Sequence, residues 1–293
     1  MIRSVALIAA FVATGVFAQG YEPHQNPIGA SAWWWDAAWW DSGQLAAADS
    51  HPLRTGWVEY PSGETNVPAM VVRPDDDQRY PAVLYQHGRR GLDDLVQGQV
   101  RRIAARGFVV LAPDLYSAHF IEKLPIEHDY SIEADVAAGL DVLLARDDVS
   151  TTRACLASHT RGGYMTLKAA VTHGRQDDAA VCYVSWYPHW QDPNAPEAMQ
   201  VYRYATEVDS LKLPVMIFIG EQEQYQRRRS IETGIDALKA LGRDATLIVY
   251  PGVGRGFDFR PPNVRTFADD LAAKDAITRA ATFIRSHLAA HAK

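Results

Sequence analysis

The residues of this sequence whose types and spacing could do chemistry centre on Ser158 to Gly163, where Thr160 lies among small residues. The apolar run that ends at Ala157 predicts a buried strand, and the residues from Gly163 to Ala170 show a helical apolar pattern. A sharp strand-to-helix turn can hold its central side chain above a sheet, as it holds a nucleophilic Ser or Cys. Small neighbours are needed because strand and helix approach closely there. The segment therefore predicts a nucleophile elbow centred on Thr160.

The elements that must position this turn alternate between strand-like and helix-like segments. A hairpin is predicted first, from residues 56–60 and 68–73 around Pro61-Ser62-Gly63. Continuous apolar strands that alternate with amphipathic helices are typical of a mostly parallel sheet with helices on both faces, and this α/β architecture is our fold prediction. The later predicted strands are 80–86, 108–112, 154–157, 179–185, 213–220 and 245–250, and the predicted helices are 99–106, 132–145, 163–171, 229–241 and 269–290.

Side chains that follow the predicted strands should gather at one edge of this sheet. Ligands of parallel α/β sheets bind beyond the carboxyl ends of the strands, where consecutive loops meet. This rule brings residues from distant parts of the sequence to a shared rim, which is the predicted site. The predicted rim residues are His87, Tyr116, Thr160, Tyr187, Glu223 and Arg255.

Over residues 56–291, the order of motifs resembles the dienelactone hydrolase family of α/β-hydrolases. Gln86-His87-Gly88 stands where the family has its oxyanion loop, and Ala112 to Tyr116 reads Ala-Pro-Asp-Leu-Tyr. The family elbow reads Gly-x-Cys-x-Gly-Gly, whereas this chain has Thr160 at the Cys position. The resemblance implies an α/β-hydrolase domain over residues 55–293 with a hydrolytic site at the elbow.

The resemblance also implies the other two members of a catalytic triad. Glu223, shortly after the strand that ends at Gly220, stands at the position of the family acid. The family motif Tyr-Pro-Gly-x-x-His-Gly-Phe has Arg255 in place of its catalytic His. A hydroxyl nucleophile needs a neighbour that takes its proton, and a guanidinium stays protonated at ordinary pH. Thr160, Glu223 and Arg255 therefore do not form a working triad of the standard kind.

Several Arg side chains near the predicted elbow suggest binding of an anion instead. Arg forks bind carboxylates in bidentate fashion, and the amino terminus of the elbow helix also favours negative charge. By resemblance, Arg260 lies close to the sequence position where the family has an Arg that holds the substrate carboxylate. Pairing of these Arg side chains with Glu221, Glu223, Asp258 or solvent is the alternative. The residues predicted to bind a small anionic ligand are Arg161, Arg255, Arg260, Arg89, Arg90 and Tyr116.

A true ester or lactone hydrolase is the second hypothesis, with Thr160 as nucleophile and His87 or His189 as a relocated base. His119 and His159 also lie near the predicted rim. Metal binding through His87, His119, His189 and Glu223 is conceivable, but no His-x-x-x-His or Cys-x-x-Cys spacing supports it. We therefore predict no metal site and no cofactor.

The amino-terminal residues predict export. Arg3, the apolar stretch from Val5 to Phe17 and the small residue Ala18 are typical of a signal peptide of residues 1–18, which is too short for a membrane span. A secreted or periplasmic protein follows from this prediction. The chain carries 29 Lys and Arg against 35 Asp and Glu, and a net charge of −6 disfavours nucleic acid as a partner.

Residues 19–54 form a predicted Trp-rich arm, with five Trp between Trp33 and Trp40. Such a cluster could bind a protein partner or a ring-shaped ligand, or it could pack over the edge of the domain. Cys155 and Cys182, both inside predicted core strands, are expected to be free buried thiols. A disulfide between them stays open, because spacing alone does not show pairing.

Overall fold

The computed structural model describes residues 32–33, 46–47, 50–261 and 263–293. The predicted signal peptide and most of the Trp-rich arm lie outside these residues, so both stay predictions. Two short strands, β1 (Ala32–Trp33) and β2 (Ala46–Ala47), pair antiparallel with each other. Within the described ranges, no helix is long and apolar enough to cross a membrane.

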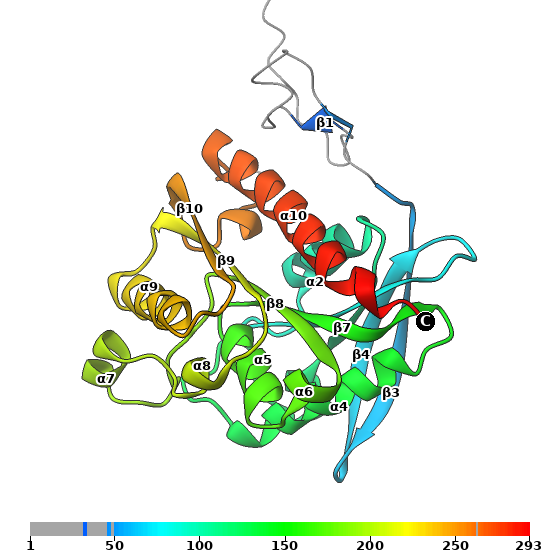
Figure 1. Cartoon of the computed structure of the whole chain (residues 1–293), viewed down its shortest axis with the longest axis horizontal. Coiled ribbons are helices and arrows are strands. Elements are labelled where there is room, and N and C mark those ends of the chain that lie inside the picture. Colours follow the sequence, from blue (N-terminus) through cyan, green and yellow to red (C-terminus); the bar gives the residue numbers. More distant parts are fainter. Residues whose placement is uncertain (1–31, 34–45, 48–49, 262) are drawn as a thin grey trace, which may run out of the picture. The chain divides into compact units, whose positions relative to one another are not determined.

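An eight-stranded sheet organises the described chain, in the order β10-β9-β8-β7-β5-β6-β4-β3 (Figure 1). The strands from β10 to β6 run parallel, and β4 pairs antiparallel with both β6 and β3. The predicted hairpin is confirmed, with Gly63 at a φ of 56° in its turn. The strands are β3 (Leu53–Ser62), β4 (Thr65–Pro74), β5 (Tyr80–Gln86), β6 (Val109–Pro113), β7 (Val149–His159), β8 (Ala180–Trp186), β9 (Val215–Gln222) and β10 (Ala245–Gly254).

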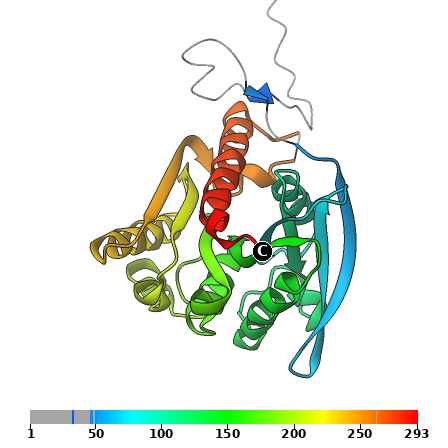
Figure 2. The same cartoon turned by 45° about the vertical axis from the view of Figure 1, so that its right-hand side comes forward.

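Helices cover both faces of this sheet (Figure 2). On one face α2 (Asp94–Ala104) and α10 (Phe267–Leu288) contact each other, and on the other α4 (Glu133–Leu144) packs beside α5 (Gly162–Val171). The fold is therefore the predicted mostly parallel α/β sandwich. The remaining helices are α3 (Leu115–Ala118), α6 (Arg175–Asp178), α7 (Glu197–Tyr202), α8 (Glu207–Ser210), α9 (Tyr225–Ala240) and the 3₁₀ turns Tyr130–Ile132, Phe257–Phe259 and Ala289–His291.

Two predicted helices begin earlier in the structure than the apolar pattern indicated. Helix α2 starts at Asp94 because the Asp93 side chain caps it by accepting a hydrogen bond from Val96 N. Helix α9 starts at Tyr225, so its first turn carries polar and charged residues that show no apolar periodicity. A side-chain cap marks the start of α2, whereas α9 begins without a side-chain cap.

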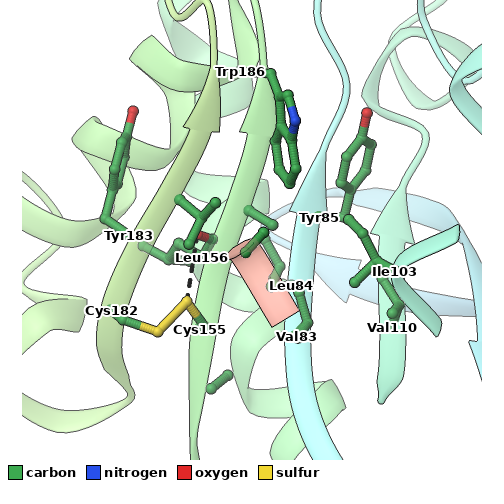
Figure 3. Packing of buried hydrophobic residues seen from close by; sticks show 14 of the residues in the cluster. Val83, Leu84, Tyr85, Ile103, Val110, Cys155, Leu156, Cys182, Tyr183 and Trp186 are labelled. Atoms are coloured by element: carbon green, nitrogen blue, oxygen red, sulfur yellow. Dashed lines mark hydrogen bonds between the residues drawn. A yellow bond between two sulfur atoms is a disulfide. The ribbon is translucent and has the colours of Figure 1, made fainter. Parts of the chain in front are cut away.

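The expectation of free thiols is wrong, because Cys155 and Cys182 form a disulfide in the core (Figure 3). The two residues lie directly opposite each other on the neighbouring parallel strands β7 and β8, with Cα atoms 4.7 Å apart. The sequence could not show this register. A crosslink over 27 residues of sequence is expected to stabilise the fold by about 3 kcal/mol, through the entropy of the unfolded chain.

Candidate active site

The elbow has the strained backbone that the sequence predicted. Thr160 lies between β7 and α5 with a φ of 51°, a region that a β-branched residue rarely adopts. Backbone hydrogen bonds hold it there: Thr160 N donates to Trp186 O at 3.2 Å, and His189 N donates to Thr160 O at 2.7 Å. Such strain persists only where the surrounding structure fixes it, as it often does at functional sites.

Three glycines make room for the elbow. A Cβ on Gly88 would lie 1.6 Å from the Thr160 hydroxyl oxygen, and a Cβ on Gly162 would lie 2.3 Å from the carbonyl oxygen of Gln86. A Cβ on Gly163 would meet Pro188 at 2.3 Å. The loop after β5 therefore lies directly against the Thr160 side chain.

Arg255, which the resemblance aligns with the family His, forms an ion pair. Arg255 Nη1 donates to Glu223 Oε2 at 3.0 Å, and the Glu223 side chain is fully buried. The other Glu223 oxygen accepts from Gln224 N at 2.8 Å. The Arg255 guanidinium also lies 5.1 Å from the centre of the Tyr187 ring. In this arrangement the acid position neutralises a guanidinium instead of orienting an imidazole.

His87 is fully buried and has both ring nitrogens engaged. Nδ1 lies 2.8 Å from Gly88 O, and Nε2 accepts from Leu115 N at 3.2 Å. Burial lowers the pKa of His87, so the ring is neutral with its proton on Nδ1. No lone pair is left for the Thr160 proton, which argues against His87 as the base.

His189 is the other candidate base, and its surroundings differ. The ring is buried and Nδ1 has no hydrogen-bond partner among the described residues. Burial lowers the pKa of His189 far below its ordinary value, and the charges of four guanidinium groups lower it further. His189 is therefore a neutral ring in a positively charged environment. The four residues are Arg255, Arg227, Arg161 and Arg89.

Two of the predicted anion-binding arginines hold a loop instead. Arg89 donates to the carbonyl oxygens of Leu124 and Pro125, both at 2.7 Å. Arg161 donates to the carbonyl oxygens of Ile126 and Glu127, both at 2.8 Å. The two guanidinium groups thus fix four successive carbonyls of the loop that follows α3. Arg161 Nε is buried and has no hydrogen-bond partner among the described residues.

The other predicted arginines lie at the mouth of the site. Arg90 forms a half-exposed ion pair with Asp93 at 2.5 Å, and Arg260 donates to the carbonyl oxygen of Arg255 at 3.3 Å. Arg90, Arg255 and Arg260 all line one cavity of about 440 Å³. Thr160 lines the same cavity, so an anion bound there would lie beside its hydroxyl. The cavity, which we call the elbow cavity, is lined by Gly88, Arg90, Leu95, Val96, Thr160, Tyr187, Arg255, Gly256, Phe259, Arg260 and Pro261.

Sequence reasoning missed Arg227, which belongs to the same positive cluster. Arg227 Nη1 donates to Gln191 Oε1 at 2.5 Å, and burial together with Arg255 and Arg161 lowers the pKa of Arg227 to about 10. A bound anion would relieve this crowding of positive charge. The run Arg227-Arg228-Arg229 is the available signal, but Arg227 and Arg228 lie before the predicted helix start at Arg229.

Tyr116 and His119, both predicted near the rim, are not among the residues that line the elbow cavity. The Tyr116 hydroxyl is buried without a hydrogen bond of good geometry, and burial raises the pKa of Tyr116 while the nearby Arg161 opposes this. His119 Nε2 lies 2.6 Å from Asp135 Oδ2. No group of three or more His, Cys, Asp or Glu in the described ranges is arranged to hold a metal ion.

A buried polar network beneath the elbow was also missed. His159 Nε2 lies 2.6 Å from Asp258 Oδ2, and His159 Nδ1 lies 2.9 Å from the Tyr85 hydroxyl. The Tyr187 hydroxyl donates to the other Asp258 oxygen. The His159 ring stacks on the Trp186 ring, with the ring centroids 4.7 Å apart. The sequence suggested Asp258 as a partner for an arginine. The structure pairs Asp258 with His159 and with the hydroxyl of Tyr187 instead.

Comparison with known proteins gives consistent results. Residues 67–288 match the model of the dienelactone hydrolase family. A provisionally named carboxymethylenebutenolidase of Yersinia pestis is 26% identical over 237 residues, which cover 74% of this chain and 85% of the relative. Its counterpart in Escherichia coli strain K12 is 27% identical over 236 residues, with 73% and 82% covered.

Solved structures show the same fold at lower identity. A provisionally named dienelactone hydrolase from Klebsiella pneumoniae superposes with a TM-score of 0.62 at 23% identity, covering 82% of this chain and 99% of its own. A dienelactone hydrolase-like promiscuous phosphotriesterase from metagenomic libraries gives a TM-score of 0.61 at 17% identity, covering 80% and 98%. These likenesses establish the α/β-hydrolase architecture.

Proposed function

Because this chain belongs to the dienelactone hydrolase family, we propose that it binds a small carboxylate-bearing ligand in the elbow cavity, with little or no hydrolysis of the standard kind. The observation that carries the proposal is Arg255, which replaces the family His and pairs with the buried Glu223. A protonated guanidinium cannot accept the Thr160 proton, so the usual acylation step has no base.

Unsatisfied polar atoms support anion binding. Arg255 Nη2 is buried without a hydrogen-bond partner among the described residues, and it belongs to a residue that lines the elbow cavity. Arg90 and Arg260 line the same cavity and add positive charge. A buried donor without a partner costs free energy, which a carboxylate oxygen would recover. The relatives' name, carboxymethylenebutenolidase, also points to a ligand that carries a lactone and a carboxylate.

A second candidate function is ester or lactone hydrolysis with Thr160 as nucleophile and His189 as base. It is favoured by one observation: the His189 ring is neutral, with Nδ1 unpaired in the described chain, and its backbone N–H binds the Thr160 carbonyl. Against it, the Thr160 hydroxyl makes no hydrogen bond to any described residue, His189 included. We therefore rank it below ligand binding.

Export to an oxidising compartment is also part of this proposal. The signal peptide predicted over residues 1–18 would place the protein in the periplasm or outside the cell. The Cys155–Cys182 disulfide supports this, because such crosslinks persist in oxidising compartments.

The proposal is tested by calorimetric titration with benzoate, using benzamide as the uncharged control. We expect benzoate alone to bind, and Arg255→Gln to weaken binding at least tenfold, since the variant removes a charged donor. The double variant Arg255→Gln with Glu223→Gln, which leaves no unpaired buried carboxylate, should bind equally weakly. Arg243→Gln, at an exposed position outside the cavity, is the matched control.

Hydrolysis of 4-nitrophenyl acetate is measured on the same samples. The expected result is no turnover above that of Thr160→Ala. Turnover that Thr160→Ala abolishes would overturn the proposal in favour of the hydrolase. Equal binding of benzoate and benzamide would overturn it as well.

A further inference from the structure

A second cavity, of about 320 Å³, lies under the segment that follows α3, and neither the family assignment nor the proposed function uses it. Three apolar side chains, Ile121, Pro125 and Ile132, form part of its wall. A volume of this size suits a small ligand. The cavity, which we call the loop cavity, is lined by Tyr116, Ile121, Pro125, Glu127, His128, Asp129 and Ile132.

Two of these lining residues carry buried polar atoms without partners in the described chain: the Tyr116 hydroxyl and His128 Nδ1. His128 is 4% exposed and Tyr116 is 3% exposed. His128 Nε2 lies 2.9 Å from Glu133 Oε1, so in the neutral ring the proton sits on Nε2 and Nδ1 is left as an acceptor. Buried polar groups without a partner are rare, and both of these belong to residues that line the cavity. His128 Nδ1 lacks a hydrogen-bond donor, whereas the Tyr116 hydroxyl can itself donate and lies close to the Arg161 guanidinium.

Two of the residues that line the loop cavity carry negative charge. Glu127 and Asp129, both exposed, contribute two carboxylates to the lining. Hydrogen bonds from Ser131 lower the pKa of Asp129, so that carboxylate is ionised at neutral pH. Positive charge lies at the Tyr116 side of the wall, where the guanidinium groups of Arg161 and Arg89 are close, and behind residues 124–127, so the carboxylates of Glu127 and Asp129 are the part of the lining that suits a cation.

The wall of the loop cavity is held rigidly in place. Arg89 and Arg161 bind four successive carbonyls of residues 124–127. The backbone of His128 is held by Asn194, whose side chain both accepts from His128 N and donates to His128 O at 2.8 Å. A preformed wall lowers the entropy lost on binding.

Apolar side chains lie on the outer surface of the same segment. Phe120 is 93% exposed and Ile126 is 86% exposed, and Leu124 is also exposed. Phe120 and Leu124 hold left-handed backbone conformations, with φ of 54° and 62°, although neither is a glycine. Each of the three neighbours a lining residue in sequence. An apolar chain that left the cavity would therefore meet apolar surface.

We propose that the loop cavity is a ligand site for a protonated amine carried on a short apolar chain. The ammonium group would donate to His128 Nδ1 and would lie beside the carboxylates of Glu127 and Asp129. The apolar chain would pack on Ile121, Pro125 and Ile132. This site is independent of the anion proposed for the elbow cavity, because it shares no lining residue with it.

The test is calorimetric titration of the full chain with butylamine at pH 7.5, where the amine is protonated. Butan-1-ol and butyramide, which keep the chain but lose the positive charge, are the matched controls. Butylammonium should bind, and the two controls should not. Glu127→Gln should weaken binding about fivefold, whereas Glu122→Gln, an exposed change outside the lining, should leave it unchanged.

A filling variant, Ile121→Phe, tests the location separately from the charge. Ile121 is only partly buried, so the larger ring can enter the cavity without disrupting the core, and circular dichroism verifies that the variant folds. It should remove butylammonium binding while leaving benzoate binding intact. Binding of butan-1-ol as tight as butylammonium, no binding of butylammonium at millimolar concentration, or binding that Ile121→Phe leaves unchanged would each overturn the proposal. Loss of benzoate binding alone, with butylammonium still bound, would refute only the proposed function.

Discussion

The elbow and the loop after β10 differ in how much of a hydrolase each retains. At the elbow, Gly88, Gly162 and Gly163 leave room for a strained Thr160, so the geometry for presenting a nucleophile is intact. After β10, Arg255, which the resemblance aligns with the family His, pairs with Glu223. In the function that we propose, the backbone requirement of the chemistry is met on one side of the cavity, while the proton-transfer requirement is not met on the other. Shape and reactivity are separable properties of one site.

The first way to test this difference between the two regions is to remove the elbow geometry. In Gly162→Ala the new methyl group would lie 2.3 Å from Gln86 O and 2.7 Å from His87 O, both backbone atoms that cannot move aside alone. We expect a loss of about 3 kcal/mol or more in the free energy of unfolding. Urea unfolding followed by circular dichroism measures it.

Gly56→Ala is the matched control, since a Cβ there meets nothing within 4 Å. If the two variants were equally stable, the close approach of α5 to the loop after β5 would not be a requirement of this fold.

The second way is to restore the chemistry of the β10 side. The double variant Thr160→Cys with Arg255→His supplies a nucleophile and a base, with Glu223 already in place to orient the imidazole. We expect hydrolysis of 4-nitrophenyl acetate to rise about 100-fold over either single variant, within the usual contribution of a general base. Initial rates at pH 7.5 measure this gain.

Thr160→Cys alone is the informative control for this experiment. A rate as high as that of the double variant would mean that another residue, such as His189, already serves as base.

The third way concerns the buried histidines around the site. Burial lowers the pKa of His87, His159 and His189, so the folded protein binds fewer protons than the unfolded chain below the ordinary value of 6.5. The contribution of these neutral rings to the free energy of unfolding should therefore be complete above pH 6.5. It should fall as the pH drops below 6.5, by up to about 1.4 kcal/mol per pH unit for each His. Urea unfolding between pH 7.5 and pH 5 gives the slope.

His189→Gln should flatten this slope by about one third, because each His contributes up to one proton. The exposed His173→Gln should leave it unchanged. A slope that is the same in both variants would show that His189 is protonated in the folded state, against the assignment of a neutral ring among arginines.

The sequence could predict those features that depend on local pattern. Continuous apolar runs located the parallel strands, and the residues around Thr160 identified its turn, because small residues and a strand-to-helix transition are visible in one short segment. The resemblance to the family then aligned Glu223 with Arg255, which the structure joins by an ion pair.

The features that the sequence could not predict depend on contacts between distant segments. Arg89 and Arg161 bind carbonyls of residues 124–127, and backbone carbonyls leave no trace in side-chain composition. The pairing of Cys155 with Cys182 depends on the register of β7 against β8, where a shift of one residue would separate the thiols. Ion pairs with Asp or Glu were the alternative expected for the arginines that were predicted to bind an anion. Among these, Arg255 and Arg90 form such pairs, at 3.0 Å and 2.5 Å.

The disulfide has a practical consequence for the identity of a purified sample. Its two cysteines belong to the strands that carry Thr160 and Tyr187 at their carboxyl ends, so the crosslink joins the two supports of the elbow cavity. Two preparations of the same sequence would differ in covalent structure if one folded in a reducing cytosol and the other in an oxidising compartment. Thiol titration of the denatured chain distinguishes them, with two reactive sulfurs in one sample and none in the other. Binding data from the two should be compared only after that titration.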